Sequence, residues 1–318
     1  SAHERMANYL VTGGAGFIGS HLVERLIRDG HTVRVLDNLS TGHRQNLDSV
    51  AGKLELIEGD AADASTVDRA MKGVEGVFHL AAMPSVPRSI REPLLNQKAG
   101  EVATLTVLDA AQRAGVRRVV FTSSSAIYGN SSAPKNLEDQ SPAPLNPYAL
   151  SKLTGEGYCR VFSGLHPDLD TVCLRYFNVF GPRQDPSSPY SGVISIFLKC
   201  LRERIAPTIF GDGLQTRDFV EVSNIAEANV LAMNASQPQR GTAFNVGTGE
   251  SVTLLDIWSW LCEIAGLRME PNFGPERAGD IKHSAASIEK IRRELGFEPR
   301  VRCREGLERL WKSLASAP

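Results

Sequence analysis

The sequence predicts an α/β protein in which helices cover both faces of a parallel sheet and a smaller lobe follows. Short runs rich in Val, Ile, Leu and Phe show little polar alternation, which is typical of strands buried on both faces. These runs alternate with segments whose apolar residues recur at helical spacing. The chain has 318 residues, enough for one large domain or two unequal ones. Together these observations favour a doubly wound parallel sheet.

The expected strands follow one another through the first half of the chain. They are residues 9–12, 32–37, 54–57, 77–80, 119–123 and 171–176. Between the first two strands, Leu22, Val23, Leu26 and Ile27 recur at the spacing of a buried helix face. This alternation is that of strand–helix–strand units, which place their strands parallel.

After about residue 180 the pattern changes, because short elements mix there with turns. We predict a main domain over residues 6–180 and a mainly substrate-binding lobe over 181–318. Within the second range, about 215–246 is expected to return to the main domain, with 242–246 adding a strand to its sheet. The cleft between the two lobes is the expected ligand site.

Charge and cysteine content exclude several classes of partner. Lys and Arg number 35 and Asp and Glu number 36, so no overall field favours nucleic acid or an anionic membrane. We expect neither as a partner. The five cysteines are widely scattered and form no paired spacing, which favours free thiols in a reducing, cytoplasmic location and no metal site.

A glycine-rich turn between the first strand and the first helix predicts a dinucleotide site. Gly13 suits the tight turn, Gly16 lets the backbone approach a pyrophosphate, and Gly19 permits close packing of the helix. The free N–H groups and the dipole at the start of the helix favour a diphosphate there.

Two acidic residues follow the next strands. Asp37 ends the second strand, where its carboxylate can accept hydrogen bonds from ribose hydroxyls and would repel a 2′-phosphate. This favours NAD over NADP, although His43 and Arg44, which lie nearby in the sequence, make the preference weaker. Asp60 follows the third strand and has two interpretations: contact with the adenine edge, or the N-cap of a helix.

A tyrosine and a lysine four residues apart form the candidate catalytic group. Tyr148 and Lys152 share one face if the segment is helical, and Pro147 suits the start of that helix. An ammonium beside a phenol favours the phenolate, so we predict that Lys152 lowers the pKa of Tyr148 toward neutrality. The fifth strand ends in Thr122, Ser123, Ser124 and Ser125, and a hydroxyl there is placed to contact the same substrate oxygen.

These motifs resemble those of the extended short-chain dehydrogenases/reductases, above all the UDP-hexose 4-epimerases. The resemblance covers nearly the whole chain. It rests on residues 13–19 (GGAGFIG), 121–129 (FTSSSAIYG), 147–152 (PYALSK), 174–182 (LRYFNVFGP) and 217–220 (RDFV). It implies a Rossmann-type sheet, the triad Ser124, Tyr148 and Lys152, and transfer of hydride from the sugar C4 to NAD and back to its other face. The family's cofactor-facing asparagine is missing, because Lys98, Ala99 and Gly100 stand there.

The resemblance also implies which residues bind the ligands. For the cofactor these are Gly13, Gly16, Phe17, Ile18, Gly19, Asp37, Asn38, Ser40, Thr41, Gly42, Asp60, Ala61, Leu80, Ala81, Ala82, Tyr148, Lys152 and Phe177. For the UDP-sugar they are Ser85, Val86, Arg88, Ser124, Tyr148, Asn178, Val193, Ile209, Phe210, Arg217, Arg277, Asp280 and Ser284. Arginines such as Arg217 and Arg277 suit phosphate, because they give charge-assisted hydrogen bonds.

The identity of the sugar stays open at this point. Ser284 stands where relatives restricted to glucose and galactose often have a bulky tyrosine. The smaller serine leaves room for an acetamido group. UDP-glucose/UDP-galactose and UDP-N-acetylglucosamine/UDP-N-acetylgalactosamine are therefore both considered, since a cavity rejects a smaller group only weakly. Asn178 stands where uronate epimerases tend to have threonine, which disfavours a UDP-uronic acid.

Other activities on the same fold are weighed against epimerisation. A dehydratase would need an Asp–Glu pair where Ser125 and Ala126 stand. A nucleotide-sugar 4-ketoreductase is harder to exclude. A non-catalytic NAD-sensing protein is disfavoured, because a sensor need not keep a proton-transfer group. In relatives, helices equivalent to 94–114 and 148–162 pack in a dimeric four-helix bundle, so we expect a homodimer.

Overall fold

The computed structural model describes residues 5–185 and 192–316 of the chain. These residues form two compact units that interleave along the sequence. The first contains the described residues of Ser1–Ile127, Pro142–Arg175 and Ala226–Phe244. The second contains those of Tyr128–Ser141, Tyr176–Ile225 and Asn245–Pro318. The division predicted from the sequence, 6–180 and 181–318, uses continuous ranges and stays a prediction.

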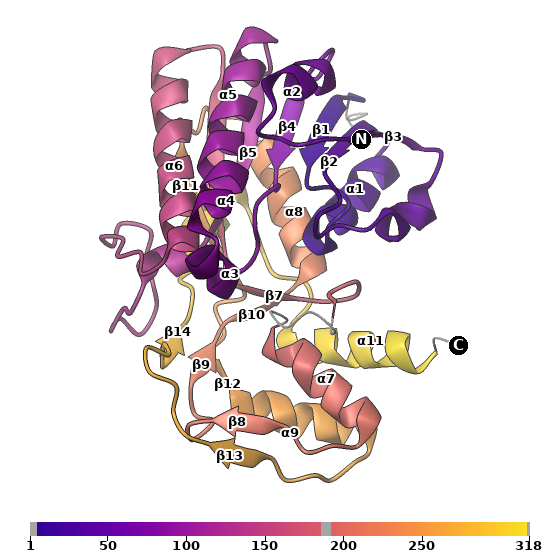
Figure 1. Cartoon of the computed structure of the whole chain (residues 1–318), viewed down its shortest axis with the longest axis vertical. Helices are drawn as coiled ribbons and strands as arrows, with labels where there is room; N and C mark the ends of the chain where they lie inside the picture. The colour runs from indigo at the N-terminus through magenta and orange to yellow at the C-terminus, as the bar shows by residue number, and fades with distance from the viewer. Residues whose placement is uncertain (1–4, 186–191, 317–318) are drawn as a thin grey trace. The chain divides into compact units, whose positions relative to one another are not determined.

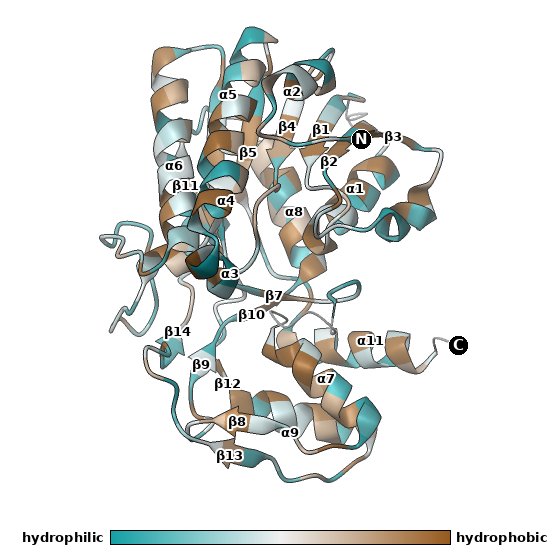
Figure 2. Ribbon diagram, viewed as in Figure 1, coloured by the Kyte–Doolittle hydropathy of each residue, from teal (hydrophilic) through white to brown (hydrophobic). Residues whose placement is uncertain are grey.

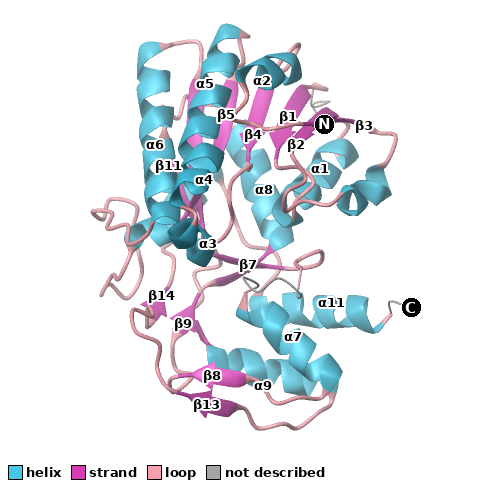
Figure 3. Cartoon of the chain, in the orientation of Figure 1, coloured by secondary structure: helices cyan, strands magenta, loops and turns pink. Residues whose placement is uncertain are grey.

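The first unit is built on a seven-stranded sheet (Figures 1 and 3). Its strands are β1 (Asn8–Thr12), β2 (Thr32–Asp37), β3 (Leu54–Glu58), β4 (Gly76–His79), β5 (Arg118–Ser124), β6 (Asp170–Tyr176) and β11 (Thr242–Val246). The order across the sheet is β11-β6-β5-β4-β1-β2-β3, and β5, β4, β1, β2 and β3 pair in parallel. This is the predicted Rossmann-type arrangement, in which strand order reverses beside β1. The return of residues 242–246 to the sheet is confirmed.

Helices lie against the sheet in two groups. One group contains α1 (Phe17–Arg28) and α8 (Val222–Met233), which are joined by an ion pair between Arg25 and Glu227 at 2.5 Å. The other contains α2 (Ala64–Ala70), α5 (Ala103–Arg113) and α6 (Pro147–Leu165), which pack side by side. A doubly wound sheet is covered in this way because each face of its strands is apolar.

The segment before α5 is helical but irregular. It comprises α3 (Val86–Arg91), α4 (Pro93–Gln97) and a π-helical turn over Lys98–Val102 that continues into α5. Pro93 at the start of α4 separates it from α3, because a proline inside a helix cannot donate to the preceding turn. The predicted helix over 94–114 is therefore present, with a π-turn inside it. Such turns are frequent at functional sites.

Close packing fixes α6 on the strand that it covers. A Cβ atom at Gly155 would overlap the ring of Phe121 on β5, so only glycine permits this approach. The side chains of Phe121, Cys159 and Cys173 belong to the same buried apolar cluster of the first unit. The start of α6 is thereby held next to the end of β5.

The second unit consists of helices and small sheets. Its helices are α7 (Val193–Glu203), α9 (Leu254–Ala265), α10 (Glu289–Leu295) and α11 (Cys303–Ala315). Its strands pair as β7 (Asn178–Phe180) with β10 (Phe219–Glu221), β8 (Thr208–Phe210) with β13 (Asn272–Gly274), and β9 (Thr216–Arg217) with both β12 (Val252–Thr253) and β14 (His283–Ser284). Its core includes Phe180, Phe197 and Trp258. Helix α7 changes from hydrophobic to hydrophilic toward its C-terminal end (Figure 2).

No helix in the described part of the chain is long and apolar enough to cross a membrane.

Candidate active site

The glycine turn after β1 has the geometry that its sequence predicts. Gly13 has a φ of +71°, a conformation that side chains rarely adopt. A Cβ atom at Gly19 would overlap the carbonyl oxygen of Gly13, so the helix can approach the turn only through a glycine. Gly16 is the N-cap of α1 and offers no side chain to satisfy the first N–H groups. This leaves the start of α1 suited to an anionic group such as a diphosphate.

Asp37 at the end of β2 is fixed beside this turn. One carboxylate oxygen, Oδ2, accepts a hydrogen bond from the N–H of Ala15 at 3.0 Å, and the other accepts from the N–H of Leu39 at 2.8 Å. Gly42 lies against the same carboxylate, because a Cβ there would come within 2.9 Å of Oδ2. The predicted ribose-binding residue is therefore preorganised next to the predicted diphosphate site.

Asp60 does not cap a helix. Its Oδ1 accepts from the N–H of Ala62 at 2.8 Å, whereas the N-cap of α2 is Asp63, which accepts from the N–H of Thr66 at 3.1 Å. The helix-cap interpretation of Asp60 is therefore wrong. The carboxylate of Asp60 also lies 3.4 Å from Nζ of Lys98, a residue of the π-turn where the family pattern is broken.

A buried histidine that the sequence motifs do not mark connects three of these elements. His79 at the end of β4 bonds Oγ1 of Thr12 through Nδ1 at 2.6 Å and Oγ1 of Thr104 through Nε2 at 3.0 Å. Because Thr12 Oγ1 already accepts from the N–H groups of Leu80 and Ala81, it donates to Nδ1. Burial, with a smaller effect from Lys152, lowers the pKa of His79 to about 3. The ring is therefore neutral and fixes the backbone after β4.

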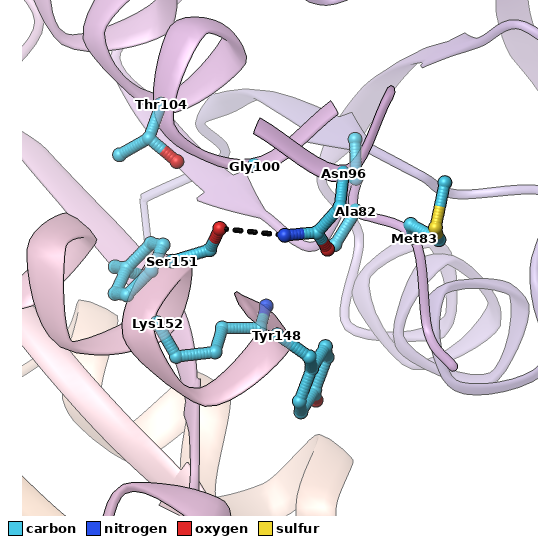
Figure 4. Close-up of a pocket in the computed structure, with 10 residues that line it drawn as sticks. Ala82, Met83, Asn96, Gly100, Thr104, Tyr148, Ser151 and Lys152 are labelled. Atoms are coloured by element: carbon cyan, nitrogen blue, oxygen red, sulfur yellow. Dashed lines mark hydrogen bonds between the residues drawn. The ribbon is translucent and has the colours of Figure 1, made fainter. Parts of the chain in front are cut away.

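The predicted catalytic side chains meet where β5 ends and α6 begins. Asn146 caps α6 by accepting from the N–H of Ala149 at 2.9 Å. Tyr148 and Lys152 are thereby placed on one face of the first helical turns (Figure 4). The phenol of Tyr148 forms a hydrogen bond with the side chain of Ser124. The structure thus brings the three residues of the predicted triad together.

The prediction that Lys152 lowers the pKa of Tyr148 is wrong. Burial raises the pKa of Tyr148, and the hydrogen bond from Ser124 lowers it by less. Nζ of Lys152 donates to the carbonyl of Thr122 at 2.8 Å and lies 5.7 Å from the centre of the tyrosine ring. Burial also lowers the pKa of Lys152 to about 8. Desolvation thus disfavours the charged form of each group.

A pocket joins this group to residues predicted for the cofactor (Figure 4). It is lined by Ala81, Ala82, Met83, Asn96, Gly100, Thr104, Phe121, Tyr148, Ser151 and Lys152. Asn96 is buried and was not predicted from the sequence; its Nδ2 donates to Oγ of Ser151 at 3.0 Å. Gly100 has no side chain, and a Cβ atom there would come within 3.0 Å of Ser151.

Several residues of the loop expected to line the sugar site form hydrogen bonds or ion pairs within the protein. Ser85 caps α3 by accepting from the N–H of Arg88 at 3.1 Å, and the guanidinium of Arg88 pairs with Glu92 at 2.7 Å. Val86 is the first residue of α3. Ser89 Oγ accepts from the N–H of Tyr148 at 3.2 Å, which fixes α3 against the start of α6.

In the second unit, residues predicted for the nucleotide lie on neighbouring strands. Ser284 of β14 pairs with Arg217 of β9. Burial lowers the pKa of Arg217, and the charge of Asp280 opposes that shift. The guanidinium of Arg277 lies 3.8 Å from the centre of the Phe210 ring. Arg217 is half-buried and Arg277 is exposed, and arginine side chains suit the phosphates of a nucleoside diphosphate.

Four other predicted residues are placed less directly. Phe177 is buried with its ring against Tyr128 at 6.3 Å, and Asn178 begins β7 with an exposed side chain. Ile209 is 1% exposed and belongs to the core of the second unit, so its side chain is not accessible to a ligand. Val193 is the first residue of α7.

Within residues 5–185 and 192–316, no group of three His, Cys, Asp or Glu side chains is placed to hold a metal.

Comparison with known proteins identifies similar enzymes of full length. The UDP-glucose 4-epimerase of Mycolicibacterium smegmatis is 40% identical over 302 residues, which cover 94% of this chain and 95% of that protein. The structure of a UDP-N-acetylglucosamine 4-epimerase from Methanobrevibacter ruminantium in complex with UDP-N-acetylmuramic acid matches with a TM-score of 0.93 at 38% identity, over 98% of this chain and 99% of that one. The Thermus thermophilus UDP-glucose 4-epimerase complex with NAD matches with a TM-score of 0.88 at 37% identity, over 98% and 100% of the two chains.

The family comparison covers the part of the chain that holds the glycine turn and the candidate catalytic residues. The model of the NAD dependent epimerase/dehydratase family matches residues 9–247. That range includes the glycine turn, Asp37, Ser124, Tyr148 and Lys152. On this match and on the identity with full-length relatives, the chain belongs to the NAD dependent epimerase/dehydratase family.

Proposed function

We propose that this protein interconverts UDP-hexoses at C4 through a transient 4-keto sugar, using NAD. The observation that carries the proposal is the hydrogen-bonded pair of Ser124 and Tyr148 beside the buried ammonium of Lys152, in a pocket shared with Ala81 and Ala82. Relatives named as UDP-glucose and UDP-N-acetylglucosamine 4-epimerases support the same assignment.

The residues present fit an NAD cofactor. The start of α1 packs directly on the glycine turn, because a Cβ at Gly19 would overlap the Gly13 carbonyl, and the first N–H groups of α1 have no side-chain cap. Asp37 holds a carboxylate beside that turn for the ribose hydroxyls. When bound, NAD supplies the nicotinamide that accepts hydride from the sugar C4 and returns it to the opposite face. We propose that the glycine turn, Asp37, the segment Leu80–Ala82 and Lys152 hold it.

Tyr148 is the group that we propose moves the proton of the 4-hydroxyl. Its burial raises the phenol pKa, so the phenolate must be stabilised by its neighbours. Ser124 already does so through a hydrogen bond, and Lys152 remains about nine-tenths protonated at pH 7 with a pKa of about 8. After donating to the Thr122 carbonyl, Nζ of Lys152 keeps two N–H groups for the ligands.

For the substrate we propose that Arg217 and Arg277 hold the diphosphate and that Asp280 holds the uridine ribose. Ser284 is small, so we propose UDP-glucose/UDP-galactose as substrates with UDP-N-acetylglucosamine/UDP-N-acetylgalactosamine also accepted. Arg217 is partly desolvated by burial, which strengthens a charge-assisted hydrogen bond to phosphate.

The test is incubation with UDP-glucose and, separately, UDP-N-acetylglucosamine, followed by separation of the C4 epimers. We expect an epimer to form in at least the first reaction without added NAD, because the cofactor is retained. Net conversion of added NAD to NADH with release of a 4-keto sugar would assign a 4-ketoreductase running in reverse instead. A bound sugar nucleotide with no turnover would assign a sensor.

We also propose that the protein is a homodimer. Large apolar side chains are exposed on α4 and α6, which contact each other, including Leu94 (81% exposed), Leu150 and Leu165. Burying them against a second copy would remove apolar surface from water.

The expected location is the cytoplasm, supported by the five cysteines, all free thiols.

A further inference from the structure

A buried ion pair lies next to the candidate catalytic group without belonging to it. Glu156 is one helical turn beyond Lys152 on α6, and Arg175 is on β6. Arg175 donates from Nη2 to Oε1 of Glu156 at 2.7 Å and from Nε to Oε2 at 2.9 Å. The two side chains are only 6% and 3% exposed. This bidentate pair fixes the position of the Glu156 carboxylate inside the first unit.

The same carboxylate holds the end of β5. Ser123, which is 1% exposed, donates from Oγ to Oε2 of Glu156 at 2.5 Å. Its two neighbours along the strand both contact the candidate catalytic residues: the carbonyl of Thr122 accepts from Nζ of Lys152, and the side chain of Ser124 bonds Tyr148. Ser123 is therefore the attachment point between the two contacts on which the site depends.

Stability alone does not explain why an ion pair is buried here. Burying two charges costs several kcal/mol in desolvation, and an apolar pair of similar volume is often equally stable. What the charges add here is direction, because a short hydrogen bond to a fixed carboxylate allows little movement of the hydroxyl that makes it. A role in positioning explains why a serine faces this carboxylate.

We propose that Ser123, Glu156 and Arg175 form a positioning unit that sets the distance between the end of β5 and the catalytic face of α6. These residues act through Ser124 and the Thr122 carbonyl and do not touch the substrate themselves. The inference rests on the proposed epimerase function. Its consequence is specific: without the Ser123 hydroxyl, the end of β5 is free to shift, and Tyr148 loses part of the hydrogen bond that lowers its pKa.

The experiment compares Ser123→Ala with Ser163→Ala. Ser163, on α6, is a matched control because it is fully buried, as Ser123 is. Its Oγ pairs with Oγ1 of Thr171 at 2.7 Å, and this hydrogen bond involves no candidate catalytic residue. Each variant loses one buried hydroxyl, so we expect similar small decreases in melting temperature. For Ser123→Ala we expect kcat to fall about 10- to 100-fold with KM within about threefold, since small misplacements of reacting groups cost this much.

The pH profile separates positioning from packing. In Ser123→Ala the acidic limb of kcat should move to higher pH, because the phenolate of Tyr148 is less stabilised; in Ser163→Ala it should stay in place. In a Ser124→Ala background the Ser123→Ala change should lower kcat by a smaller factor than in the wild type, because the contact through Ser124 is already lost and only the one through the Thr122 carbonyl remains.

Equal kcat values and equal pH limbs for Ser123→Ala and Ser163→Ala would overturn the inference. An additive loss in the Ser124→Ala background would overturn it as well, since Ser123 would then act independently. A wild-type protein that epimerises no UDP-sugar contradicts the proposed function instead. The two failures are therefore distinguished by the wild-type assay.

Discussion

At the scale of single residues, burial determines the charge states in the site. It raises the pKa of Tyr148, lowers that of Lys152 to about 8 and lowers that of His79 to about 3. All three groups are thereby driven toward their neutral forms. Lys152 still carries its proton at pH 7, whereas a phenolate at neutral pH must be stabilised by specific contacts, of which the Ser124–Tyr148 hydrogen bond is one.

The alkaline limit of activity is predicted from Lys152. Only its protonated form can hold a ribose hydroxyl as a charged donor and favour the phenolate, and that form is lost as pH rises through about 8. We expect kcat/KM to fall above about pH 8. In Lys152→Arg the charge persists, so this limb should move to higher pH even if the rate is lower. An unchanged limb in that variant would assign it to another group.

A second prediction concerns stability and His79. The folded ring has a pKa of about 3, whereas an unfolded histidine titrates near its model value of 6.5. The unfolded chain therefore binds more protons between these values, and stability rises with pH across that window. Acidification from pH 7 to 5 should cost about 2 kcal/mol through this residue. Urea unfolding of His79→Gln should show a pH dependence smaller by this amount; equal dependence would show that His79 is not buried and neutral.

At the scale of elements, the sequence predicts those parts of the site whose residues lie close together along the chain. The glycine turn and the Tyr148–Lys152 spacing are local patterns whose geometry follows from one strand–turn–helix unit and one helical turn. The Ser123–Glu156–Arg175 unit joins β5, α6 and β6, so no spacing in the sequence marks it. Short strands such as β9 and β14 were not predicted either, because two residues carry no periodic pattern.

The glycine turn itself gives an element-scale prediction. A Cβ in Gly19→Ala would overlap the Gly13 carbonyl, so α1 must shift away from the turn. We expect loss of retained NAD and a destabilisation of about 1–3 kcal/mol. Gly157→Ala on α6 is the control, because its Cβ meets no atom within 4 Å and alanine favours a helix by about 1 kcal/mol. Absorbance of bound cofactor and thermal melting measure both, and cofactor retained by Gly19→Ala would contradict the assignment.

At the scale of the whole molecule, the order of strands in the sheet brings the site residues together. Asp37, Asp60, His79 and Ser124 each stand at or just after the end of a strand of one parallel sheet, which is where ligands of such sheets bind. Sequence reasoning found most of these positions, since each follows an apolar run. It misassigned the pKa of Tyr148, because the desolvation that raises it depends on the packing of the whole first unit.

The exposed apolar face on α4 and α6 leads to a prediction about assembly. Charges at Leu94→Glu and Leu150→Glu would have to be buried in the proposed dimer, so we expect the double variant to be monomeric by light scattering while the wild type is dimeric. Leu214→Glu, a similarly exposed leucine of the second unit, should leave the dimer intact. A monomeric wild type would remove the proposal.

The most direct measurement is the rate of UDP-glucose epimerisation by Tyr148→Phe. This variant keeps the ring and removes only the hydroxyl that bonds Ser124. We expect kcat to fall about 10²- to 10⁴-fold, as for other lost acid–base groups, while NAD stays bound and the melting temperature changes little. A variant that turns over at the wild-type rate would contradict the account.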